Sequence, residues 1–309
     1  MKFRLLLILV FFMFLFSCKT MRINSVLKSG KEKDIINLSK TENLKSFIDE
    51  KGSNPLILAA LNGNYDAVKL FLDKKDFNIN YINYQGVSAL TAATLNNHIK
   101  IAQLLIDNSA DVNSINNLTN TNPLLAAIGY GRNEIAELLI KYGTDLNVSY
   151  TDGYRPLHIA VLSDKNTIPR LLIDNGAEVD AVNYNGVTPL MQAVEYGKIE
   201  NVKLLLEKGA NPNAVDKKGK NPLMLACTKK SLEIVQVLLV SGADINSQTF
   251  FNLTPLMVAI SFENQEIAEF LIKSGANLVL KDKEGKTAYE YAVALKMKKI
   301  IDLLQFTKL

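Results

Sequence analysis

The strongest pattern in this chain is a block of hydrophobic and small residues that recurs at an almost constant interval. Its central leucine falls at positions 56, 90, 124, 157, 190, 223 and 256, and Tyr289 continues the series. The first two intervals are 34 residues long and the next five are 33. A period this regular predicts a stack of similar units, an architecture that presents an extended surface to other molecules.

Within each repeat, polar and apolar positions predict two short helices. The residue before the block can cap a helix in seven repeats: Asn54, Ser88, Asn122, Thr188, Asn221, Thr254 and Thr287. Such side chains accept hydrogen bonds from the free N–H groups of a helix start, and Arg155 is the exception. Proline follows in six repeats, where its missing N–H is no loss. Apolar runs such as residues 234–239 predict the second helix.

The residue that follows the second helix is another recurring position in each repeat. Glycine stands there in five repeats, at Gly143, Gly176, Gly209, Gly242 and Gly275. Glycine at this place predicts a left-handed cap that ends the helix. Lys75 and Ser109 replace it in the first two repeats, so we expect those two junctions to be less regular.

Together these motifs are similar to the ankyrin repeat. Residues 186–190 read Gly-Val-Thr-Pro-Leu, residues 156–160 read Pro-Leu-His-Ile-Ala, and residues 209–211 read Gly-Ala-Asn. The resemblance implies an all-α ankyrin-repeat solenoid of helix-turn-helix units joined by β-hairpin-like loops. About eight repeats would fill residues 49–306, the last of them acting as a C-terminal cap. Residues 23–48 lack the motif, and we predict that they form a degenerate helical N-terminal cap.

The N-terminus has the pattern of a targeting segment. Lys2 and Arg4 precede an apolar run of 12 residues, from Leu5 to Phe16. That run is shorter than the roughly 20 residues that a membrane-spanning helix needs, and its layout is typical of a signal peptide. We therefore assign residues 1–17 to a signal peptide.

The end of that segment, residues 15–18, reads Leu-Phe-Ser-Cys and resembles the lipobox of bacterial lipoproteins. The resemblance implies cleavage before Cys18, lipid attachment to Cys18, and residues 18–22 as a lipidated tether. Lys19, in place of aspartate, implies the outer membrane or the cell surface rather than the inner membrane. An ordinary signal peptide with an incidental cysteine, or an uncleaved anchor, remains the alternative.

The small net charge and the absence of known catalytic and metal-binding motifs argue against several classes of function. The net charge is +4, and removing Lys2 and Arg4 leaves 33 basic and 31 acidic residues, or +2, which gives no reason to expect nucleic-acid binding. The sequence has no nucleotide-binding, zinc or calcium motif. His98 and His158 occupy structural positions of the ankyrin pattern, and Cys227 occupies a small buried one. We expect no enzyme activity, cofactor, metal or small-molecule substrate.

Candidate binding residues come from the aromatic and apolar side chains at the hairpin tips and at the ends of the first helices. They are Tyr84, Leu118, Tyr130, Tyr150, Tyr154, Tyr184, Tyr196, Phe250, Phe251 and Phe262. On ankyrin geometry these positions line a concave face, and exposed rings commonly anchor interfaces. The alternative is that the rings pack on neighbouring hairpins and serve the fold.

A second candidate is a group of five lysines in the sixth repeat: Lys217, Lys218, Lys220, Lys229 and Lys230. They can engage an acidic protein surface, an anionic glycan or lipid headgroups. The alternative is an ordinary solvated face.

These features favour a non-enzymatic, membrane-anchored lipoprotein of a bacterial envelope that binds a protein partner. Two alternatives stay open at this point. One is an accessory or regulatory factor for an envelope enzyme, and the other is a surface-displayed protein that interacts with a host.

Overall fold

The computed structural model of the chain describes residues 21–28, 32–41 and 44–306. The predicted signal peptide and Cys18 lie outside these residues. The chain divides into two compact units, Met1–Asp145 and Leu146–Leu309, here called the N-terminal and C-terminal units. Each is described by itself.

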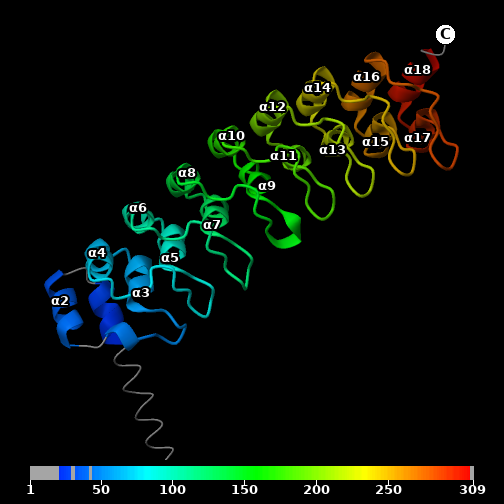
Figure 1. Ribbon diagram of the computed structural model, residues 1–309. Coiled ribbons are helices and arrows are strands. Elements are labelled where there is room, and N and C mark those ends of the chain that lie inside the picture. The colour runs from blue at the N-terminus through cyan, green and yellow to red at the C-terminus, as the bar shows by residue number, and fades with distance from the viewer. Residues whose placement is uncertain (1–20, 29–31, 42–43, 307–309) are drawn as a thin grey trace, which may run out of the picture. The chain divides into compact units, whose positions relative to one another are not determined.

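The N-terminal unit contains three helix pairs preceded by further helical segments (Figure 1). Residues 21–28 are helical, and the following elements are α2 (Glu32–Thr41), η1 (Leu44–Ser46), α3 (Pro55–Leu61), α4 (Tyr65–Asp73), α5 (Ala89–Leu95), α6 (Ile99–Asp107), α7 (Pro123–Gly129) and α8 (Asn133–Lys141). The first helices α3, α5 and α7 pack side by side, and so do the second helices α4, α6 and α8.

The C-terminal unit contains five pairs. They are α9 (Pro156–Ala160) with α10 (Thr167–Asp174), α11 (Pro189–Glu195) with α12 (Ile199–Glu207), α13 (Pro222–Lys229) with α14 (Leu232–Val240), α15 (Pro255–Ser261) with α16 (Gln265–Lys273), and α17 (Ala288–Ala294) with α18 (Lys298–Phe306). A short 3-10 turn, η2 (Thr151–Gly153), precedes α9. In each repeat the hairpin and the second helix lie on opposite sides of the first helix (Figure 1).

The repeated leucines form the core between neighbouring helices. Leu56, Leu90, Leu124, Leu157, Leu190, Leu223 and Leu256 are each at most 1% exposed. The described residues contain no strand, and they show one isolated antiparallel bridge, between Asn116 and Thr121. The predicted all-α ankyrin-type solenoid is confirmed.

Side chains cap the first helices as the sequence predicts in six repeats. Asn54, Ser88, Asn122, Thr188, Asn221 and Thr254 each accept a hydrogen bond, 2.8 to 3.2 Å long, from the backbone N–H three residues ahead. Thr287 differs, because the carboxylate of Glu290 accepts from its backbone N–H at 2.8 Å and also from its hydroxyl. Each cap contributes about 1 kcal/mol to helix stability.

The expectation of irregular junctions after the first two second helices was wrong. Lys75 and Ser109 adopt positive φ angles of 50° and 68°, the same left-handed conformation that glycine adopts in the later repeats. Helices α4 and α6 are nine residues long, as most later second helices are. The cap geometry therefore prevails over residue preference, at a local cost of roughly 1–2 kcal/mol at each position.

The segment before the first repeat packs against that repeat. Ile23 and Leu27 are fully buried, and the side-chain amide of Asn64 donates to the carbonyl of Leu27 at 2.8 Å. Helix α2 packs on α4. Within residues 21–28, 32–41 and 44–306, no helix is both long enough and apolar enough to cross a membrane.

Candidate docking surface

Most hairpins share a five-residue tip whose first residue organises the turn. In the seventh repeat the backbone N–H of Thr249 donates to the carbonyl of Leu253 at 3.0 Å and closes the tip. The Thr249 hydroxyl accepts from the N–H groups of Phe251 and Leu253 at 3.2 and 3.1 Å. Asn83, Asn183, Asp216 and Asp282 bond in the same way in their own repeats. This turn leaves the second and third tip residues projecting into solvent.

Aromatic residues at these projecting positions are strongly exposed. The exposed fractions are 66% for Tyr84 in the N-terminal unit, and 65%, 58% and 65% for Tyr184, Phe250 and Phe251 in the C-terminal unit. Leu118 projects from the longer tip of the third repeat and is 70% exposed.

Three of these rings also rest on the preceding hairpin. A Cβ atom added to Gly219 would lie 2.8 Å from the backbone nitrogen of Phe250 and 3.1 Å from its ring. Tyr84 covers Gly52 and Tyr184 covers Gly153 in the same way. Each ring is therefore held in place on one side while most of its surface remains open to solvent. The rings thus pack on neighbouring hairpins, as the alternative interpretation expects, and their role in binding stays a prediction.

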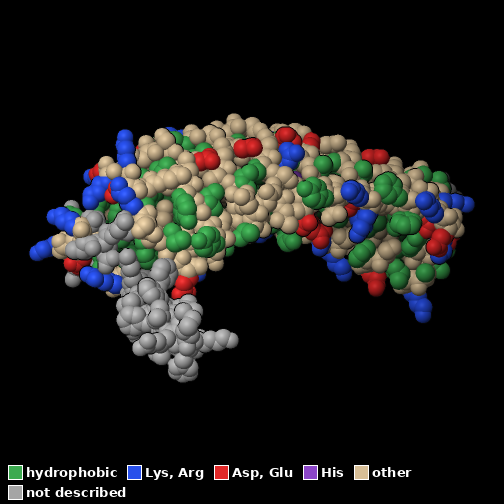
Figure 2. All heavy atoms as spheres, turned by 60° about the horizontal axis from the view of Figure 1, so that its bottom comes forward, with side chains coloured by type: hydrophobic (Ala, Val, Ile, Leu, Met, Phe, Trp, Pro, Cys, Tyr) green, Lys and Arg blue, Asp and Glu red, His purple; other side chains and the backbone are tan. Residues whose placement is uncertain are grey.

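The ends of the first helices form a second exposed row. Tyr130, Tyr196 and Phe262 are the residues that follow α7, α11 and α15, and their exposed fractions are 64%, 60% and 51%. In the N-terminal unit, one hollow is lined both by tip residues such as Gln85 and by helix-end residues such as Leu61 and Leu95. The two rows therefore border the same surface. Figure 2 shows hydrophobic side chains on one face of the C-terminal repeats, with lysines among them.

Tyr150 and Tyr154 are less exposed than the other aromatic residues predicted to bind a partner. They occupy the first and last positions of their tip, and both are half-buried. The ring of Tyr154 packs edge-on against His158, with ring centroids 5.6 Å apart. Because a tyrosine side chain cannot accept the two turn hydrogen bonds as Thr249 does, the 3-10 turn η2 replaces the usual tip, with Asp152 at a φ of 61°.

The predicted lysine group lies in the C-terminal unit, as two subsets. Lys217 and Lys218 project from the tip of the sixth repeat, whereas Lys220 closes the same tip and is half-buried. Lys229 and Lys230 lie at the end of α13, and Lys229 forms an ion pair of 2.6 Å with Glu195.

His158 and Cys227, two side chains with reactive groups, are both buried. The Nε2 atom of buried His158 lies 2.9 Å from the carbonyl of Val187, and its Nδ1 atom accepts from the backbone N–H of Arg155 at 3.2 Å. Burial lowers the pKa of His158, the hydrogen bond to Val187 opposes this, and nearby Arg155 adds to the lowering. Burial raises the pKa of the Cys227 thiol to about 12. Within the described residues, no three His, Cys, Asp or Glu side chains form a metal-binding group.

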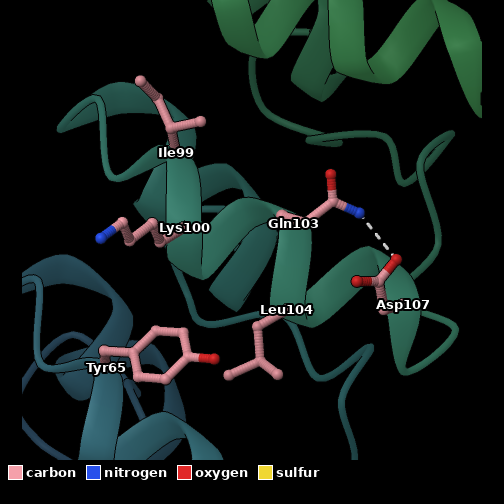
Figure 3. A pocket seen from close by; sticks show the side chains of 6 residues that line it. All are labelled: Tyr65, Ile99, Lys100, Gln103, Leu104 and Asp107. Carbon is pink, nitrogen blue, oxygen red and sulfur yellow. Dashed lines mark hydrogen bonds between the residues drawn. The ribbon is translucent and has the colours of Figure 1, made fainter.

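A further hollow lies on the second helices α4 and α6 rather than at the hairpin tips or the ends of the first helices. It is lined by Tyr65, Ile99, Lys100, Gln103, Leu104 and Asp107 (Figure 3). The Gln103 amide and the Tyr142 hydroxyl both donate to the same oxygen of Asp107, each at 2.7 Å. These bonds join α6 to the end of α8, so we assign the polar groups of this hollow to the packing of the N-terminal unit.

Comparison with known families decides what this architecture is. A family model for ankyrin repeats matches residues 24–116, 113–183, 169–249 and 223–308, which is most of the chain. The chain belongs to the ankyrin-repeat family. Ankyrin repeats typically serve as interaction scaffolds that bind proteins, and no catalytic family is indicated. The match begins at residue 24, inside the segment predicted to be an N-terminal cap.

A solved ankyrin structure supports this family assignment. The crystal structure of the ankyrin repeat domain of Bcl-3, described as a unique member of the IkappaB protein family, superposes with a TM-score of 0.65 at 30% sequence identity. The match covers 72% of this chain and 99% of that domain. Among curated protein sequences, none matches this ankyrin chain significantly.

Proposed function

We propose that this ankyrin protein is a non-enzymatic docking protein, held at a bacterial envelope membrane by lipid on Cys18. The observation that carries the docking role is the set of exposed rings in the C-terminal unit. Tyr184, Tyr196, Phe250, Phe251 and Phe262 have exposed fractions of 51% to 65%. Several large rings left in water on two adjoining rows mark a surface that a protein partner covers.

The membrane anchor rests on the sequence, and the fold indicates what an anchor would do. Among the described residues, Ile23 is the first that is buried, and it lies five residues after Cys18 in the sequence. Five residues span at most about 18 Å when fully extended. A lipid on Cys18 would therefore keep the first repeat close to the membrane surface. The proposed mechanism is tethering, which raises the local concentration of a bound partner at the membrane.

The docking role is tested by crosslinking in native envelopes, followed by purification and mass spectrometry. The full chain is compared with a Tyr184→Ser/Phe250→Ser/Phe251→Ser variant. A Val240→Ser variant is the control, because Val240 is 90% exposed on a second helix, away from the hairpins. We expect a partner that the full chain and the control capture and that the triple variant loses. Equal capture by all three would contradict docking through the tips.

The anchor needs its own test, since docking can occur without it. Cells expressing the protein are labelled with a palmitate analogue, and a Cys18→Ser variant is the control. We expect label in the first protein and none in the second. Label that persists in the variant, or no label in either protein, would contradict lipidation at Cys18.

A further inference from the structure

The hairpin tips of the last three repeats alternate in chemistry. The projecting residues are Lys217 and Lys218 in the sixth repeat and Phe250 and Phe251 in the seventh; in the eighth, Lys283 is followed by Glu284. The backbone N–H of Lys283 donates to the carbonyl of Phe251 at 3.1 Å, and its ammonium group lies 5.6 Å from the centre of the Phe251 ring. A pair of rings is thus bordered by lysines on both sides.

The ends of the first helices carry residues of the same kinds. Lys229 and Lys230 lie at the end of α13, Phe262 and Glu263 follow α15, and Leu295 and Lys296 follow α17. All six side chains are exposed. Both rows therefore have lysines in the sixth and eighth repeats and aromatic residues in the seventh.

Most acidic groups along these rows are already engaged. Asp216 and Asp282 accept the backbone N–H groups of their own tips at 2.8 to 2.9 Å. Glu284 pairs with Lys286 at 2.7 Å. Lys217, Lys218 and Lys283 form no ion pair within the described residues. Glu263, beside Phe262, is exposed and is the acid that works against the positive field here.

We propose that repeats six to eight bind a protein segment that carries an apolar side chain between acidic residues. The inference rests on the proposed docking function and specifies its ligand. Apolar contact with the rings supplies the anchor, and the lysines on both sides select negative charge at the flanks of that anchor.

The repeat spacing sets the spacing of the ligand. Helices α13, α15 and α17 pack on one another, and packed helices lie about 8–10 Å apart. An extended chain advances about 3.3 Å per residue, so about three residues cross one repeat. The expected ligand pattern is an acid, two spacer residues, an apolar residue, two spacers and a second acid.

A protein segment fits these observations better than an anionic membrane does. The hairpins extend beyond the first helices in each repeat (Figure 1), so a flat bilayer would meet the tips before the helix ends. A narrow chain can contact both rows, and both rows carry lysines in repeats six and eight and aromatic residues in repeat seven. The membrane becomes the competing outcome of the test.

The test uses the purified full chain in detergent and a phage-displayed library of random linear peptides. Selected peptides are synthesised with a fluorescent label, and their affinity is measured by anisotropy. We expect enrichment of Asp and Glu about three residues on either side of an aromatic or leucine residue. Selection without enrichment of acids, or no selected binder at all, would overturn the proposal.

Charge variants then locate the binding. A Lys217→Gln/Lys218→Gln/Lys283→Gln variant should weaken the selected peptides about tenfold at low salt, because each exposed pair contributes modestly. A control variant, Lys100→Gln/Lys141→Gln/Lys273→Gln, removes the same charge from second helices and should leave affinity unchanged. Glu263→Gln should strengthen binding about twofold. Equal losses in the charge variant and its control would overturn the proposal.

Two further comparisons separate this inference from the docking function. Phe251→Ser should weaken the peptides about tenfold or more. If the rings matter but the lysines do not, docking stands and the preference for acids fails. If neither matters, both fail. Flotation with phosphatidylcholine vesicles, with and without phosphatidylglycerol, completes the test: lysine-dependent binding to the anionic vesicles, without acidic peptides, would replace the segment by a membrane.

Discussion

Repeats four and seven of the C-terminal unit each carry two aromatic residues in the hairpin before the first helix, and the two pairs have different environments. Tyr150 and Tyr154 are half-buried, and Tyr154 packs against the buried ring of His158. Phe250 and Phe251 are exposed, with fractions of 58% and 65%. Both pairs are aromatic, so the aromatic character does not explain the difference in exposure. The two pairs differ in their positions within the tip.

The two tyrosines stand at the first and last tip positions, where the N–H of Tyr150 donates to the carbonyl of Tyr154 at 2.6 Å. The phenylalanines stand at the second and third positions, which project from the turn. At the ends of the tip the two tyrosine rings are only half-buried, and the ring of Tyr154 packs against His158. An aromatic residue in a hairpin is therefore a candidate for binding only when the turn points it outward.

The largest effect should come from giving repeat four the residue of repeat seven at the His158 position. The equivalent residue is Met257, which is 1% exposed. His158→Met keeps an apolar volume but removes the side chain that accepts from the Arg155 N–H and one of two groups bonded to the Val187 carbonyl, which still accepts from the Asn183 N–H at 3.1 Å. Unsatisfied buried groups destabilise by about 1–3 kcal/mol each, so we expect a loss of about 2 kcal/mol in urea unfolding. Unchanged stability would show that these bonds contribute nothing net.

A paired truncation tests the comparison itself. Tyr154→Ser should destabilise the protein by about 1–2 kcal/mol, because it removes a packed ring. Phe251→Ser should change the free energy of unfolding by less than about 0.5 kcal/mol, as exposed positions do. Both are measured by the same unfolding experiment. Equal losses would mean that the rings of repeat seven serve the fold as those of repeat four do.

Acidic pH should weaken repeat four. Burial holds the pKa of His158 below its ordinary value, aided by Arg155 and opposed by the Val187 hydrogen bond. As pH falls through about 6.5, the unfolded chain binds the proton before the folded chain does. Stability should therefore decline from about pH 7 towards the folded pKa. His158→Met should flatten this slope in thermal unfolding, and a slope that stays the same would assign it to other groups.

The smallest predicted change in stability comes from introducing a capping residue at position 155, before helix α9. The Arg155 side chain caps no helix N–H and instead pairs with Glu178 at 2.5 Å, with 26% and 58% of the two side chains exposed. An exposed pair contributes up to about 1 kcal/mol and often less, whereas a threonine cap contributes about 1 kcal/mol. Arg155→Thr, the residue type of Thr254, should raise stability by about 0.5 kcal/mol. A clear loss in calorimetry would show that the pair outweighs the cap.

The sequence predicts the fold almost completely because the repeat period and the helix caps are local signals. Leu157 and Leu256 mark the core whatever surrounds them, and Thr254 caps its helix through a hydrogen bond three residues away. The expectation that only glycine gives a regular junction was wrong at Lys75 and Ser109. Both residues adopt the left-handed conformation that the junction requires.

The candidate site is predicted less well because exposure depends on turn geometry. A residue such as Thr249 or Asp216 at the first tip position reveals which two side chains project. That signal is present in the sequence, and its absence at Tyr150 accompanies the lower exposure of Tyr150 and Tyr154. The stacking of Phe250 on Gly219 joins residues of adjacent repeats and can be seen only in the structure.

The most direct measurement places a photoreactive phenylalanine analogue at position 251 and, in a matched protein, at position 240, followed by irradiation of intact cells. Both positions are exposed, at 65% and 90%; position 251 is in a hairpin tip and position 240 is on the second helix α14. We predict a crosslinked protein partner from position 251 and none from position 240. Crosslinks from position 240 alone would contradict docking through the hairpin tips.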